Sequence, residues 1–400
     1  MSNGPKLPLA HIKVVEFAGL APGPFAGLIL ADWGASVTRI DKVSQKTPLQ
    51  NLDILCRGKR SIAINPKVPS GLKLLKKLVE GVDVIIDPYR PGVLEKLGLG
   101  PDVFLGSNGC NPRLVYARVL GFPPSGPQRD MAGHDLNYLA QSGVLSMMAP
   151  STPSGKPSFP LNLLADFAGG GMSCAMGILL ALFERERSGL GQVVENNMVD
   201  GARYLSSFPL IHSSNPTSPF GRKAGNNLLD GGAPFYDIYE CKDGGWMTVA
   251  CLEPQFFASF IKSLHTNLPK GWTSSSAPGF DLTPASQLQM QNWPEMRKYL
   301  VDAFLARSRD EWAAVFHGTD SCATPVLSVS EAAETNIPAP HPHLHRTPVR
   351  ASFGIGEIPS LEAGKHTQDI LSELGISQDD MKALVAEHGI RMPSTRQSKL

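Results

Sequence analysis

The stretch HIKVVEFAGLAPGPFAGLILADWGASVTRI, residues 11–40, decides the fold. His11–Phe17 is short, apolar and rich in β-branched residues, which predicts a strand, and the small and apolar residues of Pro22–Trp33 predict a helix. Ala35–Ile40 predicts a second strand. A strand, a helix and a strand in this order indicate two parallel strands joined by a helix that covers one face.

The same alternation continues through the next 80 residues. Ser70–Gly81 predicts a helix that begins at a Ser cap and ends at Gly, and Val82–Ile86 and Arg113–Val119 predict further strands. Strands separated by helices favour an α/β fold with a parallel sheet and helices on its faces. Ligands of such sheets bind beyond the carboxyl ends of the strands.

The chain changes character after residue 220. Glycine becomes frequent, and Phe235–Glu240 and Trp246–Cys251 predict a pair of strands around a Gly-rich turn, followed by helical patterns. We therefore predict three parts: a first part of the large domain over residues 1–225, a smaller α+β domain over 226–324, and a return segment over 325–397 that packs on the large domain.

Composition excludes several classes of protein. The 400 residues contain 37 Lys and Arg against 36 Asp and Glu, a net charge of +1, so nucleic acid is not predicted as a partner. The apolar run Met172–Phe183 is shorter than the roughly 20 residues that a membrane span needs, which predicts a buried helix and no span. The six cysteines contain no C-x-x-C pair and are predicted to be reduced thiols.

Common cofactor and metal motifs are absent from the sequence. It contains no P-loop, no G-x-S-x-G elbow and no H-E-x-x-H, and no G-x-G-x-x-G follows the first strand. His341, His343 and His345 alternate in a Pro-rich segment without a nearby carboxylate or Cys. We therefore predict no metal site there.

Three polar residues in apolar or Gly-rich surroundings are candidates for chemistry. His134 is predicted at a turn or helix start, where an imidazole can exchange protons near neutral pH. Asp166 is a carboxylate among apolar residues, so its pKa should be perturbed. Glu253 ends an apolar strand pattern. Each also has a structural interpretation, as a helix-start histidine, a helix cap and a first-turn carboxylate respectively.

A set of basic residues precedes these candidates. Arg39 with Lys42, and Arg90, are predicted to follow strands, and the charged segment Arg57–Arg60 lies between them. Several fixed positive charges at one edge of a sheet suit a polyphosphate ligand. Any one of them alone would be interpreted as surface charge.

Seven motifs together resemble the acyl-CoA racemases of the family III CoA-transferase superfamily. They run in order along the chain, and the likeness extends from about residue 8 to residue 380. The motifs are Ala21-Pro22-Gly23-Pro24-Phe25, Arg57-Gly58-Lys59-Arg60-Ser61, Tyr89-Arg90-Pro91-Gly92-Val93, Ala132-Gly133-His134-Asp135-Leu136-Asn137-Tyr138, Leu163-Leu164-Ala165-Asp166-Phe167, Asp230-Gly231-Gly232-Ala233-Pro234-Phe235-Tyr236 and Leu252-Glu253-Pro254-Gln255-Phe256.

The resemblance implies a Rossmann-like large domain with a parallel sheet, a smaller α+β domain, and an interlocked homodimer whose active sites are shared between subunits. It implies that His134 and Asp166 are catalytic and that Glu253 supports His134. It also implies no separate cofactor, since CoA is part of the substrate. The positions that it assigns to CoA binding are Arg39, Lys42, Lys59, Arg60, Ile64, Arg90, Gly133, Asp135, Asn137 and Tyr138.

The implied reaction interconverts the (2R) and (2S) epimers of 2-methylacyl-CoA thioesters, which serves peroxisomal β-oxidation of branched acyl chains. His134 and Asp166 would remove and return the α-proton on opposite faces, with the enolate oxygen bound by backbone N–H groups near Asp135 or Gly169–Gly171. Two alternatives stay open. One is a CoA-transferase of the same fold with Asp166 as nucleophile, and the other is a non-catalytic acyl-CoA-binding protein.

The final tripeptide indicates a location. Ser398-Lys399-Leu400 matches the C-terminal signal that a peroxisomal import receptor recognises, and the preceding residues are polar. The sequence therefore predicts the import receptor as a partner and the peroxisome as the location.

Overall fold

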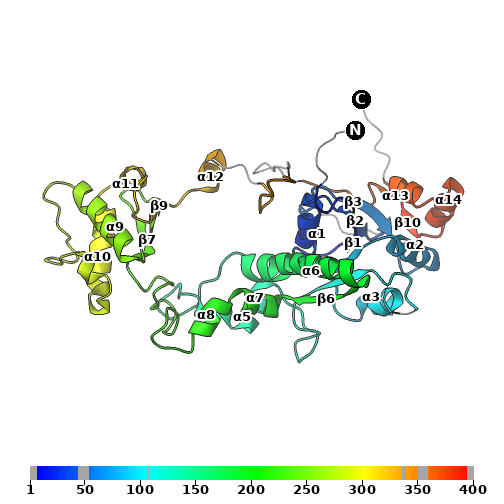
Figure 1. Cartoon of the computed structure of the whole chain (residues 1–400), viewed down its shortest axis with the longest axis horizontal. Helices are drawn as coiled ribbons and strands as arrows, with labels where there is room; N and C mark the ends of the chain where they lie inside the picture. Colours follow the sequence, from blue (N-terminus) through cyan, green and yellow to red (C-terminus); the bar gives the residue numbers. More distant parts are fainter. Residues whose placement is uncertain (1–6, 44–53, 107, 336–338, 350–358, 394–400) are drawn as a thin grey trace. The chain divides into compact units, whose positions relative to one another are not determined.

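The computed structural model describes residues 7–43, 54–106, 108–335, 339–349 and 359–393, and the chain forms two compact units (Figure 1). Unit 1 comprises residues 1–143, 160–205 and 337–400, and unit 2 comprises residues 144–159 and 206–336. Unit 2 therefore includes two segments, 144–159 and 206–225, that the sequence analysis assigned to the large domain, and residues 325–336, which it assigned to the return segment. The predicted targeting tripeptide 398–400 lies outside the described residues.

Unit 1 contains a seven-stranded sheet in the order β10-β3-β2-β1-β4-β5-β6. All neighbouring strands are parallel except β10, which is antiparallel to β3. The order of the six parallel strands, β3-β2-β1-β4-β5-β6, is that of doubly wound nucleotide-binding sheets. The strands are β1 (Lys13–Phe17), β2 (Ser36–Asp41), β3 (Arg60–Ile64), β4 (Val84–Asp87), β5 (Val115–Leu120), β6 (Gln192–Asn197) and β10 (Ile390–Arg391).

Helices cover both faces of this sheet because alternate side chains of each strand point to opposite sides. Val15 and Phe17 of β1 pack in one hydrophobic cluster with α2, α13 and α14, and Val14 packs in another with α1 and α6. These helices are α1 (Pro22–Asp32), α2 (Pro69–Glu80), α6 (Ser173–Ser188), α13 (Thr367–Glu373) and α14 (Gln378–Ala386). The predicted strand–helix pattern and the mixed α/β fold are confirmed.

The remaining helices of unit 1 connect the strands. They are α3 (Val93–Lys96), α4 (Pro101–Phe104), α5 (Asp135–Ser142), η2 (Leu163–Met172) and α7 (Met198–Leu205). The η2 segment has the wide turns of a π-helix and runs directly into α6, which gives one helical segment over Leu163–Ser188.

That segment is longer and more exposed than predicted from the run Met172–Phe183. Its 26 residues are long and apolar enough to cross a membrane by length and composition alone, a test that the core helix of a folded domain also passes. Ile178 is fully buried against the sheet, whereas Leu180 is 62% and Phe183 81% exposed. The predicted buried helix is therefore wrong for one of its sides, because both sides are apolar and the sequence does not tell them apart.

Unit 2 is built on a three-stranded antiparallel sheet in the order β7-β8-β9. Its core packs the aromatic rings of Phe260, Phe304 and Trp312 between the sheet and the helices. The predicted hairpin and helices are confirmed. The elements are η1 (Val144–Met147), α8 (Ser207–His212), β7 (Tyr236–Glu240), β8 (Trp246–Ala250), α9 (Pro254–Asn267), η3 (Pro284–Ser286), η4 (Met290–Asn292), α10 (Trp293–Phe304), α11 (Arg309–Phe316), β9 (Ala323–Pro325) and α12 (Val329–Thr335).

Candidate active site

A cavity of about 780 Å³ opens at the carboxyl ends of the strands of unit 1. It is lined by residues 19–22 after β1, 88–91 after β4 and 119–122 at the end of β5. Strands β1 and β4 are neighbours in the sheet, and the chain order reverses between them. Ligands of doubly wound folds bind in the crevice at this position, so the cavity is the first candidate for a binding site.

His134 reaches this cavity from the start of α5. It is the residue that precedes the helix, has an extended backbone and is exposed. The side-chain oxygen of Asn137 accepts a hydrogen bond from the His134 backbone N–H at 3.1 Å, and the Tyr138 hydroxyl donates to the Gly133 carbonyl. These bonds hold the backbone of residues 133 and 134 and leave the imidazole facing the cavity.

Asp166 lines the same cavity from the first turns of η2. Partial burial raises the pKa of its carboxyl group above the usual range, and the negative charge of Asp135 raises it further. A hydrogen bond from the side-chain amide of Asn162, at 3.2 Å, and the proximity of His134 act in the opposite direction. A carboxyl group in this environment keeps its proton to higher pH than a solvated one, so it can act as an acid as well as a base.

The three glycines after Asp166 serve close packing. A Cβ at Gly169 would lie 2.6 Å from the backbone nitrogen of Ala202, and a Cβ at Gly201 would lie 2.1 Å from the Gly169 carbonyl oxygen. Only glycine allows η2 and α7 to approach so closely. Gly169–Gly171 are buried, which makes the start of α5 at Asp135 the better of the two predicted positions for N–H groups that face a ligand.

The structure brings His134 and Asp166 together and leaves Glu253 in the other unit. Glu253 is exposed and immediately precedes α9, after the end of β8. The positions of the two units relative to one another are not determined, so its predicted support of His134 stays a prediction.

Four of the positions predicted for CoA line the cavity: Arg90, Gly133, Asn137 and Tyr138. The guanidinium group of Arg90 is exposed and donates to the Asp130 carbonyl at 2.9 Å. The neighbouring Tyr89 hydroxyl donates to the Ala18 carbonyl at 2.9 Å, which ties the turn after β4 to the turn after β1.

The side chain of Asp87, the last residue of β4, also stabilises the turn that follows this strand. This carboxyl group is 2% exposed and accepts the Tyr89 backbone N–H at 2.9 Å. Burial raises its pKa from 3.8 to about 6. Asp87 therefore lies in the protein interior and orders the turn whose residues 88–91 line the cavity.

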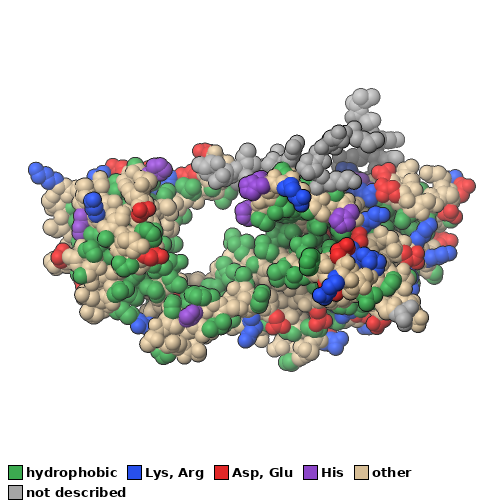
Figure 2. Space-filling view, in the orientation of Figure 1, with side chains coloured by type: hydrophobic (Ala, Val, Ile, Leu, Met, Phe, Trp, Pro, Cys, Tyr) green, Lys and Arg blue, Asp and Glu red, His purple; other side chains and the backbone are tan. Residues whose placement is uncertain are grey.

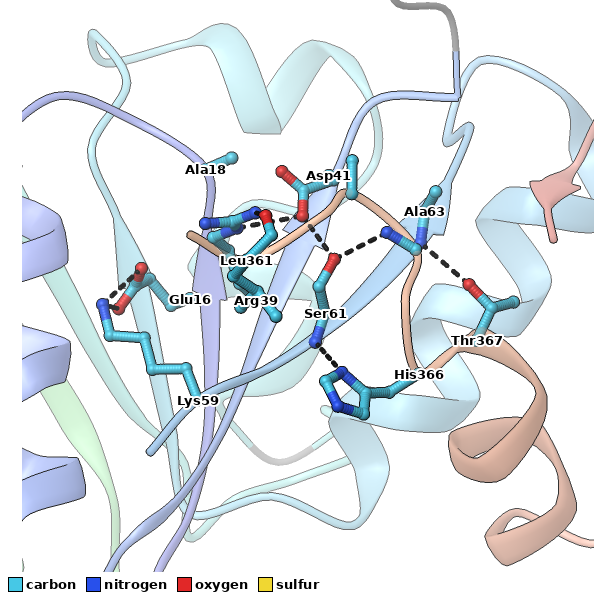
Figure 3. Close-up of polar contacts among 12 residues, drawn as sticks. Glu16, Ala18, Arg39, Asp41, Lys59, Ser61, Ala63, Leu361, His366 and Thr367 are labelled. Atoms are coloured by element: carbon cyan, nitrogen blue, oxygen red, sulfur yellow. Dashed lines mark hydrogen bonds and ion pairs between the residues drawn. The ribbon is translucent and has the colours of Figure 1, made fainter. Parts of the chain in front are cut away.

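Lys59 does not line the cavity, and its side chain is fully buried (Figure 3). Its ammonium group lies 2.8 Å from Oε2 of Glu16, which is also fully buried, and donates to the Pro24 carbonyl at 2.8 Å. A Cβ at Gly27 would lie 1.7 Å from the same Glu16 oxygen, so α1 packs directly over the ion pair. Lys59 joins β1, α1 and the start of β3 rather than presenting a charge to solvent.

Arg39 is likewise engaged inside unit 1 (Figure 3). It lies within β2 and not beyond it, because the strand extends to Asp41. Its guanidinium group pairs with Asp41 at 2.9 Å and donates to the Leu361 carbonyl at 2.8 Å, which anchors the return segment.

The other predicted CoA-binding positions also lie outside the cavity lining. Arg60 pairs with Glu373 at 2.6 Å, Ile64 is 1% exposed within β3, and Lys42 is exposed just after β2. The Asp135 carboxylate is buried and accepts backbone N–H groups within the protein.

The cavity also contains residues that the sequence analysis did not select. Arg129 adds a second basic side chain near Arg90, and Met131 and Leu20 add exposed apolar surface. In the sequence, these three residues are marked only by lying close to one of the seven motifs. In the part of the chain that the structure describes, no group of three or more His, Cys, Asp or Glu is placed to hold a metal ion.

These features define a doubly wound α/β protein with a ligand-sized crevice that contains an imidazole, a carboxyl group and basic side chains. The model of CoA-transferase family III matches residues 9–347. The α-methylacyl-CoA racemases of mouse and human are each 43% identical over 392 residues, covering 94% of this chain and 96% of theirs. A solved hypothetical protein from Mycobacterium tuberculosis has a TM-score of 0.71 at 25% identity and covers 92% of this chain and 99% of its own. The chain belongs to CoA-transferase family III.

Proposed function

We propose that this protein is an acyl-CoA racemase that interconverts the (2R) and (2S) epimers of 2-methylacyl-CoA thioesters. The observation that carries the proposal is that His134 and Asp166, two groups able to exchange protons, line one cavity at the switch point of the sheet. The relatives at 43% identity, named α-methylacyl-CoA racemases, give the proposal its substrate class.

The two side chains have complementary roles in the proposed mechanism. In one direction neutral His134 removes the α-proton while protonated Asp166 returns a proton to the other face, and in the reverse direction the roles exchange. The raised pKa of Asp166 favours this exchange of roles, because it brings the carboxyl group closer to an imidazole in proton affinity. The N-terminal N–H groups of α5 would stabilise the enolate oxygen.

The CoA part of the substrate would lie toward Arg90 and Arg129, which are the basic side chains among the residues that line the cavity. Guanidinium groups suit phosphate oxygens because they donate two parallel hydrogen bonds. The predicted role of Glu253, a residue of unit 2, stays a prediction.

The decisive experiment is incubation of one epimer of a 2-methylacyl-CoA in D₂O without an acceptor acid. We expect one deuterium at C2, detected by mass spectrometry, together with loss of optical purity. A CoA-transferase would leave the C2 hydrogen in place and turn over only when an acceptor acid is added. A non-catalytic protein would bind the ester and leave both the hydrogen and the configuration unchanged.

We further propose a homodimer, on the basis of the exposed side of α6. Five exposed apolar side chains with helical spacing form what we call the α6 stripe: Met172, the last residue of η2, and Met176, Leu179, Leu180 and Phe183 of α6. Hydrophobic side chains gather over this helix (Figure 2). A continuous apolar surface of this kind usually marks an interface, and the interlocked dimer implied by the family resemblance would cover it.

The proposed location is the peroxisome, where branched acyl-CoA oxidation would use the product. The support is the tripeptide Ser398-Lys399-Leu400. A fluorescent protein extended by residues 389–400 is expected to colocalise with a peroxisomal marker, and the same fusion without the last three residues to stay diffuse. Diffuse fluorescence from both fusions would contradict the proposed location.

A further inference from the structure

The inference concerns Asp135, the residue between His134 and α5. The family resemblance assigns this position to CoA binding, but Asp135 is 7% exposed and is not among the residues that line the cavity, although Gly133, His134 and Asn137 are. The side chain therefore points into unit 1 while its chain neighbours face the cavity.

The partners of this carboxylate lie in the segment that carries Asp166. One oxygen, Oδ2, accepts the backbone N–H of Asp166 at 2.8 Å and that of Ala165 at 3.0 Å. Both N–H groups belong to the first turns of η2, where helical N–H groups have no partner within the helix. A charged acceptor at this position is favoured by the helix dipole, and its hydrogen bonds are stronger than neutral ones.

We propose that Asp135 is a positioning residue, whose carboxylate ties the backbone of Asp166 to the residue that follows His134 and so fixes the spacing of these two side chains across the cavity. This inference rests on the proposed function. It assigns no contact with substrate to the Asp135 carboxylate.

The arrangement matters because the two groups must face one carbon from opposite sides. His134 and Asp166 lie on different helical segments, α5 and η2, that could shift independently. Displacement of a catalytic group by about 1 Å can cost 10²-fold in rate. The hydrogen bonds from the backbone of Ala165 and Asp166 to the Asp135 carboxylate, which we call the Asp135 bridge, join the two segments. One end of the bridge is the residue after His134, and the other includes Asp166 itself.

Asp135 also acts through its charge. The negative charge raises the pKa of Asp166, in the same direction as burial. Removing the charge while keeping the hydrogen-bond acceptor should therefore lower the apparent pKa of the acid limb of the rate–pH profile, to which Asp166 contributes.

Two variants distinguish the positioning role of the Asp135 hydrogen bonds from the effect of its negative charge. Asp135→Asn keeps a carbonyl oxygen that can accept both N–H groups, so kcat should stay within about 10-fold of wild type while the acid limb moves to lower pH. Asp135→Ala leaves both N–H groups without their acceptor, so kcat for deuterium incorporation should fall about 10²-fold with little change in KM. In Asp135→Ala the amides of residues 163–168 should also exchange faster in hydrogen–deuterium exchange mass spectrometry.

Asp302→Asn in unit 2 is the matched control. The Asp302 carboxylate also accepts a backbone N–H, from Ser276 at 2.8 Å. However, Asp302 belongs to unit 2 and does not line the cavity. This variant should leave the acid limb unmoved.

The outcomes distinguish this inference from the proposed function. Unchanged amide protection or unchanged kcat in Asp135→Ala overturns the positioning role, and so does an equal loss of kcat in Asp135→Asn and Asp135→Ala. Wild-type protein that incorporates no deuterium at C2 overturns the proposed function instead. The amide measurement needs no turnover and tests the Asp135 bridge in either case.

Discussion

Replacement of His134 by alanine is expected to abolish inversion of a 2-methylacyl-CoA epimer, and Asp166→Asn is expected to do the same. Each variant loses the group that serves one face of the α-carbon, and general acid–base groups of this kind contribute about 10²–10⁴-fold to a rate. CoA ester binding should persist, because Arg90 and the rest of the cavity lining are untouched. The measurement is optical purity of the thioester against time.

Each variant should still exchange the α-proton of one epimer with solvent deuterium, and this epimer should differ between the two variants. In His134→Ala the carboxyl group of Asp166 can still remove and return the proton on its own face, so one epimer takes up deuterium without inverting. In Asp166→Asn the imidazole does the same for the other epimer. Deuterium uptake should therefore be retained for opposite epimers in the two variants.

His11→Ala is a suitable control for these measurements, because His11 is an exposed histidine of unit 1 that does not line the cavity. It should invert both epimers at the wild-type rate. If His134→Ala and Asp166→Asn both still exchanged the α-proton of the same epimer, the two groups would lie on one face of the α-carbon. This result would contradict the proposed mechanism.

The parts of the fold that were predictable carry strong local patterns. β1, α1 and α2 have apolar runs bounded by Gly or Pro, and they fall within two residues of their predicted ends. The predicted Ser cap of α2 is wrong, because the helix begins at Pro69 and Ser70 lies within it. β3 and β6 were not predicted. β3 directly follows the basic segment Arg57–Lys59, which was interpreted as part of a ligand-binding set. β6 lies at the edge of the sheet and has a polar sequence, QVVENN, which is not typical of a strand.

The parts of the site that were predictable are those that depend on residue type and chain position. His134 and Asp166 stand out as polar residues beside Gly and apolar segments, and both reach the cavity. Lys59 was assigned to CoA as one of a set of basic residues, and a charge in the sequence looks the same whether it faces solvent or the interior. Asp135 was assigned to CoA by the family resemblance, which does not say where its side chain points. Their actual partners, Glu16 for Lys59 and the backbone of 165–166 for Asp135, are distant in sequence and become visible only in the folded chain.

The second large effect is expected from charges placed on the α6 stripe. α6 is apolar on both sides: Cys174, Ile178 and Ala181 are buried in unit 1, whereas Leu180 and Phe183 are 62% and 81% exposed. Burying side chains of this size contributes about 1.5–3 kcal/mol each, so several of them can hold two copies together. A Leu180→Glu/Phe183→Glu double variant should therefore be monomeric at concentrations where the wild type is dimeric, as measured by analytical ultracentrifugation.

The double variant should keep the fold of unit 1, because neither side chain belongs to the buried core, and far-UV circular dichroism and thermal unfolding check this. Lys382→Glu on α14 is the matched control, since it introduces the same charged group on another helix of unit 1, where the native side chain is already 77% exposed, and should leave the dimer intact. If the active site is shared between subunits, the monomeric variant should also lose deuterium incorporation at C2. A monomeric wild type, or a double variant that remains dimeric, would show that the α6 stripe is not the interface between two copies of this chain.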